Sequence, residues 1–219
     1  MKVMYVARSP QRKGGALSPE LRELKGYLQQ GYQWVHNGGE TVRMDHMSST
    51  AYFASGCFWG AERRFWGMDG VISTSVGYMG GTCPNPTYEE LCTGLTAHAE
   101  MVAITFDESK VSYQRLLEEF WTMHDPTSLN QQGGDIGTQY RSLIYTTTPA
   151  QYMTAIASRS VYQGVLTAEG LGQIATEIIS AKGVEYYLAE DYHQKYLAKN
   201  PNGYDCHSST GVAYPTVGA

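Results

Sequence analysis

The sequence has few cysteines, few charged residues and no long apolar run, and each shortage excludes a class of protein. Four cysteines in 219 residues are too few for a fold held together by disulfide bonds. Charged residues make up 17% of the chain and the formal net charge is −5, so the Lys and Arg excess of a nucleic-acid binder is missing. No apolar stretch approaches the ~18–20 residues of a membrane helix. The N-terminus also lacks the apolar segment of a signal peptide, so we expect a soluble, cytoplasmic protein.

Tyrosine and glycine are abundant instead, with 17 and 24 residues. Residues 1–50 differ from the rest in the pattern of polar and apolar residues, and we interpret them as an N-terminal extension. Ser18, followed by Pro19, is a typical helix start. Leucines 21, 24 and 28 then lie three and four residues apart, so the pattern predicts one amphipathic helix over residues 19–34. The polar residues from Glu40 to Thr50 are interpreted as a connector, and the helix as a surface extension or a docking segment.

The remaining residues, 51–219, are expected to form one catalytic domain of α+β class. Short apolar runs punctuated by glycine predict the order β-α-β-β-α-β, followed by further elements. This is the ferredoxin-like split βαβ motif, here with additional helices and a long irregular C-terminal segment. Strands are expected at 51–55, 71–78, 100–106, 140–145 and 174–180, and helices at 57–66, from Ser112 through Trp121, at 149–162 and at 188–198.

The pentapeptide Gly56-Cys57-Phe58-Trp59-Gly60 is the most informative part of the chain. It falls where a strand is expected to end and a helix to begin. The first N–H groups of a helix have no partner within the helix and favour an anion, so a thiol at this position should lose its proton more readily. The flanking glycines permit a tight turn and close approach of a ligand. We interpret Cys57 as a reactive thiol; the alternative is a small buried apolar residue.

With this pentapeptide the sequence resembles the A-class peptide methionine sulfoxide reductases. Further motifs of that family occur in the same order and spacing, from about Tyr52 to Ser208. They are Gly77-Tyr78-Met79-Gly80-Gly81, Asn85-Pro86-Thr87-Tyr88-Glu89-Glu90, Cys92-Thr93-Gly94, His98-Ala99-Glu100, Phe120-Trp121, His124-Asp125-Pro126, Gly137-Thr138-Gln139-Tyr140-Arg141-Ser142, Ala189-Glu190-Asp191-Tyr192-His193-Gln194, Asn200-Pro201-Asn202-Gly203-Tyr204 and Cys206. The resemblance implies reduction of free and peptide-bound methionine (S)-sulfoxide to methionine, and hence protein repair after oxidative damage.

The resemblance gives Cys57 and Glu100 the two central roles. The Cys57 thiolate would attack the sulfoxide, because a thiolate is a soft nucleophile. Glu100 would protonate the departing oxygen, for which it must keep its proton near neutral pH. Its place at the start of an apolar strand permits the required burial. A glutamate in such a place is otherwise more often a surface residue at a strand edge.

Five further residues are assigned to the site by resemblance. Tyr88 and Tyr140 correspond to two hydroxyl donors that hold the sulfoxide oxygen; a phenol donates a hydrogen bond without carrying charge. Asp135 corresponds to a carboxylate that orients the site. Phe58 and Trp59 correspond to an apolar wall around the substrate methyl group, whose burial contributes roughly 1 kcal/mol. Ordinary packing of these rings is the alternative.

The resemblance also implies how the enzyme is recycled. Oxygen transfer would leave Cys57 as a sulfenic acid, which a second thiol condenses to a disulfide. Cys206, in a mobile, Gly-rich C-terminal tail, stands at the place of the recycling cysteine. We expect a Cys57–Cys206 disulfide that thioredoxin or a similar dithiol reductant restores by exchange. No cofactor, metal, nucleic acid or membrane is expected, and we expect a monomer.

Three positions deserve separate mention. Ala97 stands where the family commonly has glycine before His98. Cys83 lies in the Gly-rich loop near the expected site and is interpreted as a bystander, with a third redox thiol as the alternative. Cys92 fills a family position and is interpreted as buried and structural.

Three other functions are alternatives for this sequence. A Cys–His–Asp hydrolase would use Cys57 with His98 or His124 and Asp135, but it leaves the tyrosines and Cys206 without a role. A metal site is disfavoured, since the cysteines and histidines lack ligand spacing. A non-catalytic redox-responsive binding module would show no sulfoxide reduction at any enzyme concentration.

Overall fold

The computed structural model describes residues 33–37, 40–44, 48–205 and 208–215. The chain divides into two units, Met1–Ser48 and Ser49–Ala219, and each is described by itself. In the first, β1 (Gln33–Asn37) pairs antiparallel with β2 (Glu40–Met44). The expectation of a connector from residue 40 to 50 was therefore wrong for residues 40–44 and 48–50, which lie in strands. The helix expected over 19–34 lies outside the described residues, except for its last two positions, which belong to β1.

The second unit is built on a six-stranded mixed sheet with the order β10-β4-β5-β3-β8-β9. The strands are β3 (Ser48–Ser55), β4 (Val71–Met79), β5 (Ala99–Asp107), β8 (Ser142–Thr146), β9 (Glu177–Ser180) and β10 (Tyr186–Leu188). Pairs β4–β5, β3–β8 and β10–β4 are antiparallel, whereas β8–β9 is parallel. The four inner strands have the order of the split βαβ motif, so the α+β prediction is confirmed.

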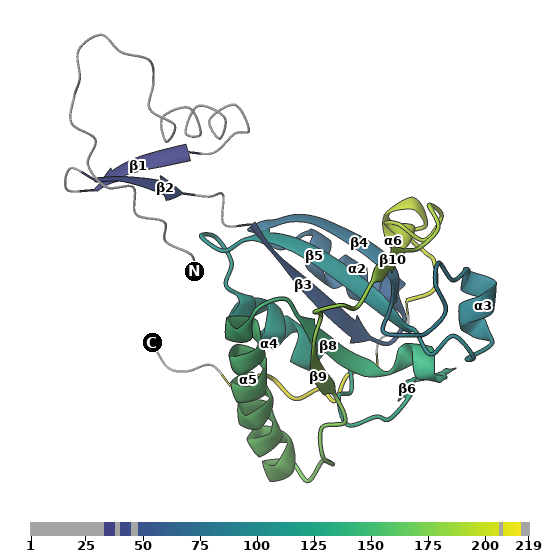
Figure 1. The fold of residues 1–219 in the computed structure, drawn as a ribbon. Coiled ribbons are helices and arrows are strands. Elements are labelled where there is room, and N and C mark those ends of the chain that lie inside the picture. Colours follow the sequence, from purple (N-terminus) through teal and green to yellow (C-terminus); the bar gives the residue numbers. More distant parts are fainter. Residues whose placement is uncertain (1–32, 38–39, 45–47, 206–207, 216–219) are drawn as a thin grey trace. The chain divides into compact units, whose positions relative to one another are not determined.

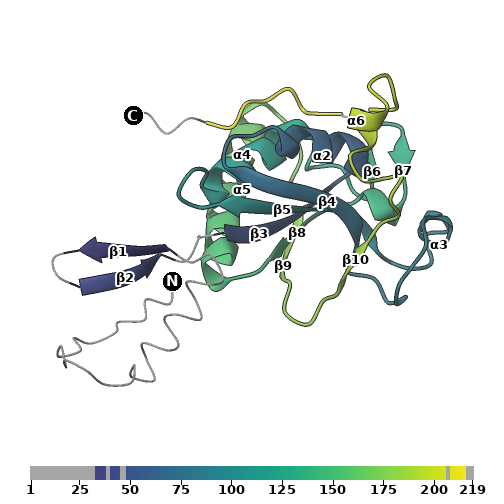
Figure 2. The same ribbon diagram turned by 90° about the horizontal axis from the view of Figure 1, so that it is seen from above.

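Three helices cover one face of this sheet, as Figures 1 and 2 show. They are α2 (Phe58–Trp66), α4 (Tyr113–Met123) and α5 (Pro149–Ala168). The hydroxyl groups of Ser112 and Thr148 cap α4 and α5, as the Ser112 start predicted. The main core fills the space between the helices and the sheet, and includes the fully buried Phe53, Phe120 and Trp121.

The alternation of side chains along β5 decides where Glu100 lies. Val102 and Ile104 belong to the core beneath the helices, whereas Ala99 and Met101 belong to a smaller cluster on the opposite face. Because successive strand residues point to opposite faces, Glu100 shares the helix-covered face with Val102. The acid thus lies on the side of the sheet where α2 begins.

Two expected elements differ in the structure. The helix expected at 188–198 was wrong: β10 ends at Leu188, and only α6 (Tyr196–Lys199) is helical. Lys195 has a left-handed φ of +52°, which interrupts a helix, and the neighbouring side chains bond to other elements instead. Tyr140 ends a short 3₁₀ turn, η1 (Thr138–Tyr140), and the strand begins at Ser142.

Short elements complete the unit. They are α3 (Tyr88–Cys92) and the small hairpin of β6 (Gln131–Gln132) and β7 (Asp135–Ile136). Among the described residues, no helix combines the length and apolar content needed to cross a membrane.

The described end of the tail is anchored on α4 and α5. The Tyr162 hydroxyl donates to the carbonyl of Val212 at 2.8 Å, and the Tyr162 ring stacks on Tyr214. Tyr214 also accepts a hydrogen bond from Gln114 of α4. These contacts hold residues 210–214 against the domain.

Ala97 carries a left-handed φ of +58°, and its carbonyl accepts a hydrogen bond from Arg141. That conformation costs a non-glycine residue about 1 kcal/mol or more. Glycine avoids this cost, but the greater conformational entropy of its unfolded chain offsets part of the stabilisation. Ala97→Gly should raise the free energy of unfolding by about 0.5 kcal/mol in a denaturant titration. Ala198→Gly, in the helical α6, is the control and should lower it by up to about 1 kcal/mol. Unchanged or lower stability of Ala97→Gly would contradict the account.

Candidate active site

Cys57 is the N-cap residue of α2 and is buried, with 6% of its surface exposed. The chain turns from β3 into α2 at Gly56, whose φ is +92°. A side chain at Gly56 would collide with Gln132, since a Cβ atom there would lie 2.7 Å from the Gln132 Cβ. Only glycine fits this turn, which delivers the sulfur to the start of the helix as the sequence predicted.

Glu100 reaches the same helix start from β5. Its side chain is buried, and Oε2 accepts a hydrogen bond of 2.9 Å from the backbone N–H of Phe58. Burial raises the pKa of Glu100 to about 8; the Phe58 N–H opposes this rise and the charge of Asp135 adds to it. At neutral pH the carboxyl group therefore holds a proton, which is the state required of a general acid.

The thiol of Cys57 does not ionise as readily as its place in the sequence suggested. Its pKa is raised, first by burial and then by the charges of Glu100 and Asp135. The backbone N–H groups of Trp59 and Gly60 lower the pKa, but burial prevails. In the free enzyme the thiol is protonated, so the expectation of a thiolate there was wrong. A helix start offers little stabilisation when an acidic side chain already occupies its first N–H group.

Tyr88 and Tyr140 approach Glu100 from two other elements, α3 and η1. Both are half-buried, and the pKa of each hydroxyl is raised, mainly by burial and next by Glu100. Both therefore remain phenols that can donate a hydrogen bond. Thr87 caps α3 through a capping box with Glu90, which fixes the helix that carries Tyr88.

Asp135 contributes from β7. Its charge raises the pKa of Cys57, Glu100 and Tyr140, which places it beside the same group of side chains. Oδ1 accepts a hydrogen bond of 3.0 Å from the hydroxyl of Tyr204. Oδ2 is buried and has no hydrogen-bond partner among the described residues. A buried acceptor of this kind can receive a donor from a substrate.

The two residues of the expected aromatic wall, Phe58 and Trp59, differ in how deeply they are buried. Phe58 is almost fully buried and contacts the rings of Tyr78 and His193. Trp59 is half-buried; its ring stacks on Tyr196 at 3.8 Å between centroids, and its N–H donates to His193 Nδ1 at 3.0 Å. Of the two rings, only Trp59 therefore keeps an accessible aromatic surface, while Phe58 belongs to the core.

Cys206 lies outside the described residues, but the two residues before it are tied to the site. Tyr204 bonds to Asp135, and Asp205 forms an ion pair with Arg63 of α2. The start of the tail is thus held next to the helix that begins at Cys57.

The other cysteines and the histidines lie elsewhere. Cys92 is exposed, so its interpretation as buried was wrong: the five-residue α3 buries only Leu91. Cys83 is half-buried, with its sulfur toward the carbonyl of Pro84. The ring nitrogens of His98 contact Gly81 N and Cys83 O, and those of His124 contact Phe120 O and Ser142 Oγ. The structure does not bring either histidine to Cys57 as a hydrolase would require.

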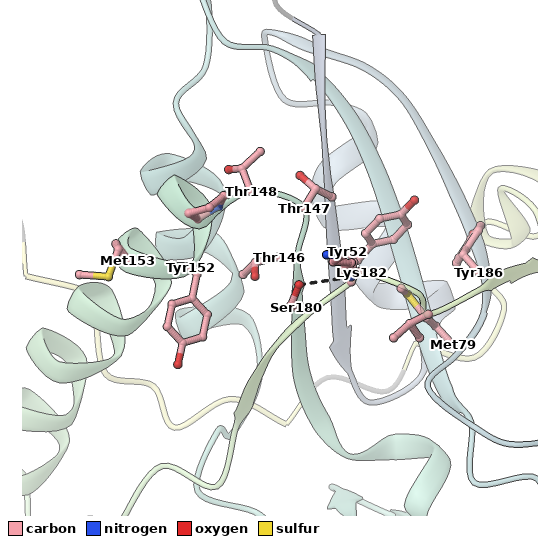
Figure 3. Close-up of a pocket in the computed structure, with 13 residues that line it drawn as sticks. Tyr52, Met79, Thr146, Thr147, Thr148, Tyr152, Met153, Ser180, Lys182 and Tyr186 are labelled. Carbon is pink, nitrogen blue, oxygen red and sulfur yellow. Dashed lines mark hydrogen bonds between the residues drawn. The ribbon is translucent and has the colours of Figure 1, made fainter. Parts of the chain in front are cut away.

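A cavity of about 730 Å³ opens on the other face of the sheet, between the start of α5 and the β9–β10 connection (Figure 3). Tyr52, Met79, Tyr152, Lys182 and Tyr186 are among its lining residues. It contains none of the expected site residues. The described residues also contain no group of three or more His, Cys, Asp or Glu side chains arranged to hold a metal ion.

Sequence reasoning missed His193, Tyr196 and Tyr204 as neighbours of the site. His193 and Tyr204 lie inside motifs of the resemblance, and Tyr204 stands two positions before Cys206. The short distance to Cys206 in the sequence could have indicated that Tyr204 lies near the site. No sequence pattern, however, pairs Tyr204 with Asp135, 69 residues away.

The comparisons with known proteins agree with this geometry. A family model described as peptide methionine sulfoxide reductase matches residues 49–216. The chain is 58% identical over 165 residues to the peptide methionine sulfoxide reductase MsrA of Pseudomonas entomophila, covering 75% of this chain and 73% of the relative. It is 56% identical to MsrA 1 of Synechocystis, covering 76% and 74%. The chain belongs to the peptide methionine sulfoxide reductase family.

Solved structures of the family share the fold. Methionine sulfoxide reductase A of Corynebacterium diphtheriae superposes with a TM-score of 0.70 at 49% identity, covering 76% of this chain and 81% of that one. Mxr1 of Saccharomyces cerevisiae in its reduced form gives 0.65 at 30% identity, covering 81% and 96%. The protein is thus an oxidoreductase that reduces methionine sulfoxide by thiol chemistry. The hydrolase and the non-catalytic binding module are excluded as its main function.

Because ionised Glu100 raises the pKa of Cys57, removing its charge should make the thiol easier to ionise. We predict that the alkylation rate of Cys57 begins to rise at a lower pH in Glu100→Gln than in the wild type. The rate is measured by mass analysis of the peptide that contains Cys57. The difference should be largest above pH 8, where Glu100 is ionised. Glu185→Gln, which removes an exposed charge, should leave the profile unchanged. Identical profiles for wild type and Glu100→Gln would show that the two groups are uncoupled.

Proposed function

We propose that Cys57 removes the oxygen of methionine sulfoxide while Glu100 supplies a proton to that oxygen. The observation that carries this proposal is the hydrogen bond from Phe58 N–H to Glu100, which holds a protonated carboxyl group next to the residue that bears the sulfur. In the net step the thiol becomes a sulfenic acid and the sulfoxide a thioether, so one oxygen moves and the number of protons is unchanged.

Cys57 and Glu100 are both neutral before the reaction, and this suggests the order of the proton transfers. Glu100 protonates the sulfoxide oxygen and makes its sulfur a better electrophile. The carboxylate that remains can take the proton that Cys57 loses as its sulfur attacks. The Trp59 and Gly60 N–H groups lower the pKa of Cys57 and so favour the sulfur as negative charge develops on it.

Tyr88 and Tyr140 hold the sulfoxide oxygen, and Trp59 contacts the methyl group. Donors for the oxygen and an apolar surface for the methyl group fix two of the three substituents on the chiral sulfur, and the side-chain methylene takes the third position. We infer that this arrangement selects the S epimer, in free and peptide-bound methionine sulfoxide. Asp135, with its buried Oδ2, accepts a hydrogen bond from the substrate and orients the site.

Cys206 completes the cycle in this proposal. Its thiol condenses with the sulfenic acid of Cys57, releasing water and forming a Cys57–Cys206 disulfide. The anchoring of Tyr204 and Asp205 beside α2 supports a short reach between the two sulfurs. A dithiol reductant of the thioredoxin type then restores both thiols by exchange.

The proposed catalytic domain spans residues 51–219, and we propose that it acts as a monomer. A reducing cytoplasm would supply the dithiol.

Two cysteine variants test the cycle. Cys57→Ser should abolish reduction of methionine sulfoxide, since no thiol remains to accept the oxygen. Cys206→Ser should reduce one equivalent of sulfoxide per enzyme and then stop when thioredoxin is the reductant. Quench-flow with product analysis separates the first turnover from later ones. Cys92→Ser is the matched control and should cycle normally; full steady-state turnover by Cys206→Ser would refute the recycling role.

A further inference from the structure

The irregular segment Ala189–Tyr196 contacts the site's substrate walls and the helix that starts at Cys57. Its Glu190 accepts a hydrogen bond from the backbone N–H of Tyr88, on the oxygen side of the site. Its His193 and Tyr196 hold Trp59, on the methyl side. The segment has almost no regular structure, so specific side-chain bonds must hold it in place.

The strongest of these bonds joins Lys195 to Glu62 of α2. Glu62 is fully buried, and its carboxylate accepts from the backbone N–H of Lys195 at 2.8 Å and from Lys195 Nζ at 2.7 Å. The Thr74 hydroxyl donates to the same carboxylate, at 2.8 Å. A buried carboxylate is costly unless it is paired and hydrogen-bonded, and this one is both.

Lys195 has a backbone conformation that is unfavourable for lysine. Its φ of +52° lies in the left-handed region, which side chains other than glycine and asparagine seldom adopt. Such a residue persists where surrounding bonds over-determine it, and such sites cluster around functional centres. The two bonds to Glu62 from the same residue provide that constraint.

The geometry connects this pair to the methyl wall. Glu62 lies one helical turn after Trp59, so both project from neighbouring positions on α2. Lys195 lies between His193 and Tyr196, the two residues that hold the Trp59 ring. His193 is fully buried, and burial lowers its pKa, so the ring is neutral. Its Nδ1 accepts the Trp59 N–H, which leaves one orientation for the indole.

We propose that the Glu62–Lys195 pair is a positioning device that fixes His193 and Tyr196 on Trp59 and thereby sets the size of the methyl pocket. Glu62 and Lys195 touch no reacting atom; they act through the two residues that hold the indole. The pair thus determines how strictly the enzyme prefers a methyl sulfoxide to one with a larger alkyl group. This inference rests on the proposed role of Trp59.

The test compares methionine sulfoxide with ethionine sulfoxide, which carries one more methylene on sulfur. A pocket can discriminate one methylene by about 10- to 200-fold in kcat/KM. In Glu62→Gln and in Lys195→Met, that preference should fall by about fivefold, and KM for methionine sulfoxide should rise by about five- to tenfold. The rate of the first turnover at saturating sulfoxide should change by less than about twofold, since Cys57 and Glu100 are untouched.

The double variant Glu62→Gln/Lys195→Met removes both charges together and leaves no buried charge unpaired. Its preference for methionine sulfoxide over ethionine sulfoxide should match that of the single variants, because substitutions of residues that act as one unit do not have additive effects. It also serves as the folded test protein if a single variant fails to fold. Glu169→Gln, which removes an exposed charge at the end of α5, should keep the wild-type preference.

A wild-type preference in the folded double variant would overturn the inference, and so would a loss confined to kcat with KM unchanged. The proposed function is judged separately by the wild type. Failure of the wild type to reduce methionine sulfoxide would refute the proposed function and this inference together. Reduction by the wild type with an unaltered preference in the variants would refute the inference alone.

Discussion

One hydrogen bond organises the catalytic end of this domain: the first backbone N–H of α2 donates to the buried carboxyl group of Glu100. A helix start normally favours an anion, and here an acidic side chain from another element occupies its first donor. Burial outweighs that donor and keeps the carboxyl group protonated at neutral pH. The same burial, with the charge of Asp135, keeps the thiol of Cys57 protonated. Two neutral groups therefore lie at the start of α2, and the proposed mechanism passes the proton of Glu100 to the sulfoxide oxygen and the proton of Cys57 to Glu100.

The fold brings these groups together by simple means. The split βαβ order sets β5 next to β3, so the acid on one strand lies near the helix that follows the other. A glycine that admits no side chain turns the chain from β3 into α2. Tyr88 and Tyr140, the proposed oxygen donors, lie on α3 and η1, which are short elements in connections. Connections commonly carry functional side chains on a rigid scaffold, and the segment from Ala189 to Tyr196 contacts Tyr88 of α3 and Trp59 of α2.

The sequence allowed prediction of the features that depend on local pattern. Period-two and helical periodicities, with caps such as Ser112, indicated the order of the inner strands and helices. The motif around Cys57 indicated a thiol at a helix start. What the pattern could not predict was burial, because burial depends on residues distant in the chain. The pKa of Cys57 was therefore expected to fall, whereas burial raises it.

Irregular structure was equally beyond local pattern. Residues 188–198 look helical by composition, yet their side chains bond to α2, α3 and β4, and Lys195 adopts a left-handed φ. Cys92 looked apolar and buried, but a five-residue helix leaves most of its side chains exposed. The Tyr204–Asp135 bond joins residues far apart in the chain. In each case a tertiary contact overrides the local preference.

The proton on Glu100 is the central claim, and infrared spectroscopy tests it directly. A protonated carboxyl group has a carbonyl stretch that is well separated from that of a carboxylate, and the spectrum of Glu100→Gln identifies the band by subtraction. The account predicts that the wild type shows a Glu100 carboxylic acid band at pH 7 that disappears as pH rises through about 8. A Glu100 that is already a carboxylate at pH 6 would contradict it.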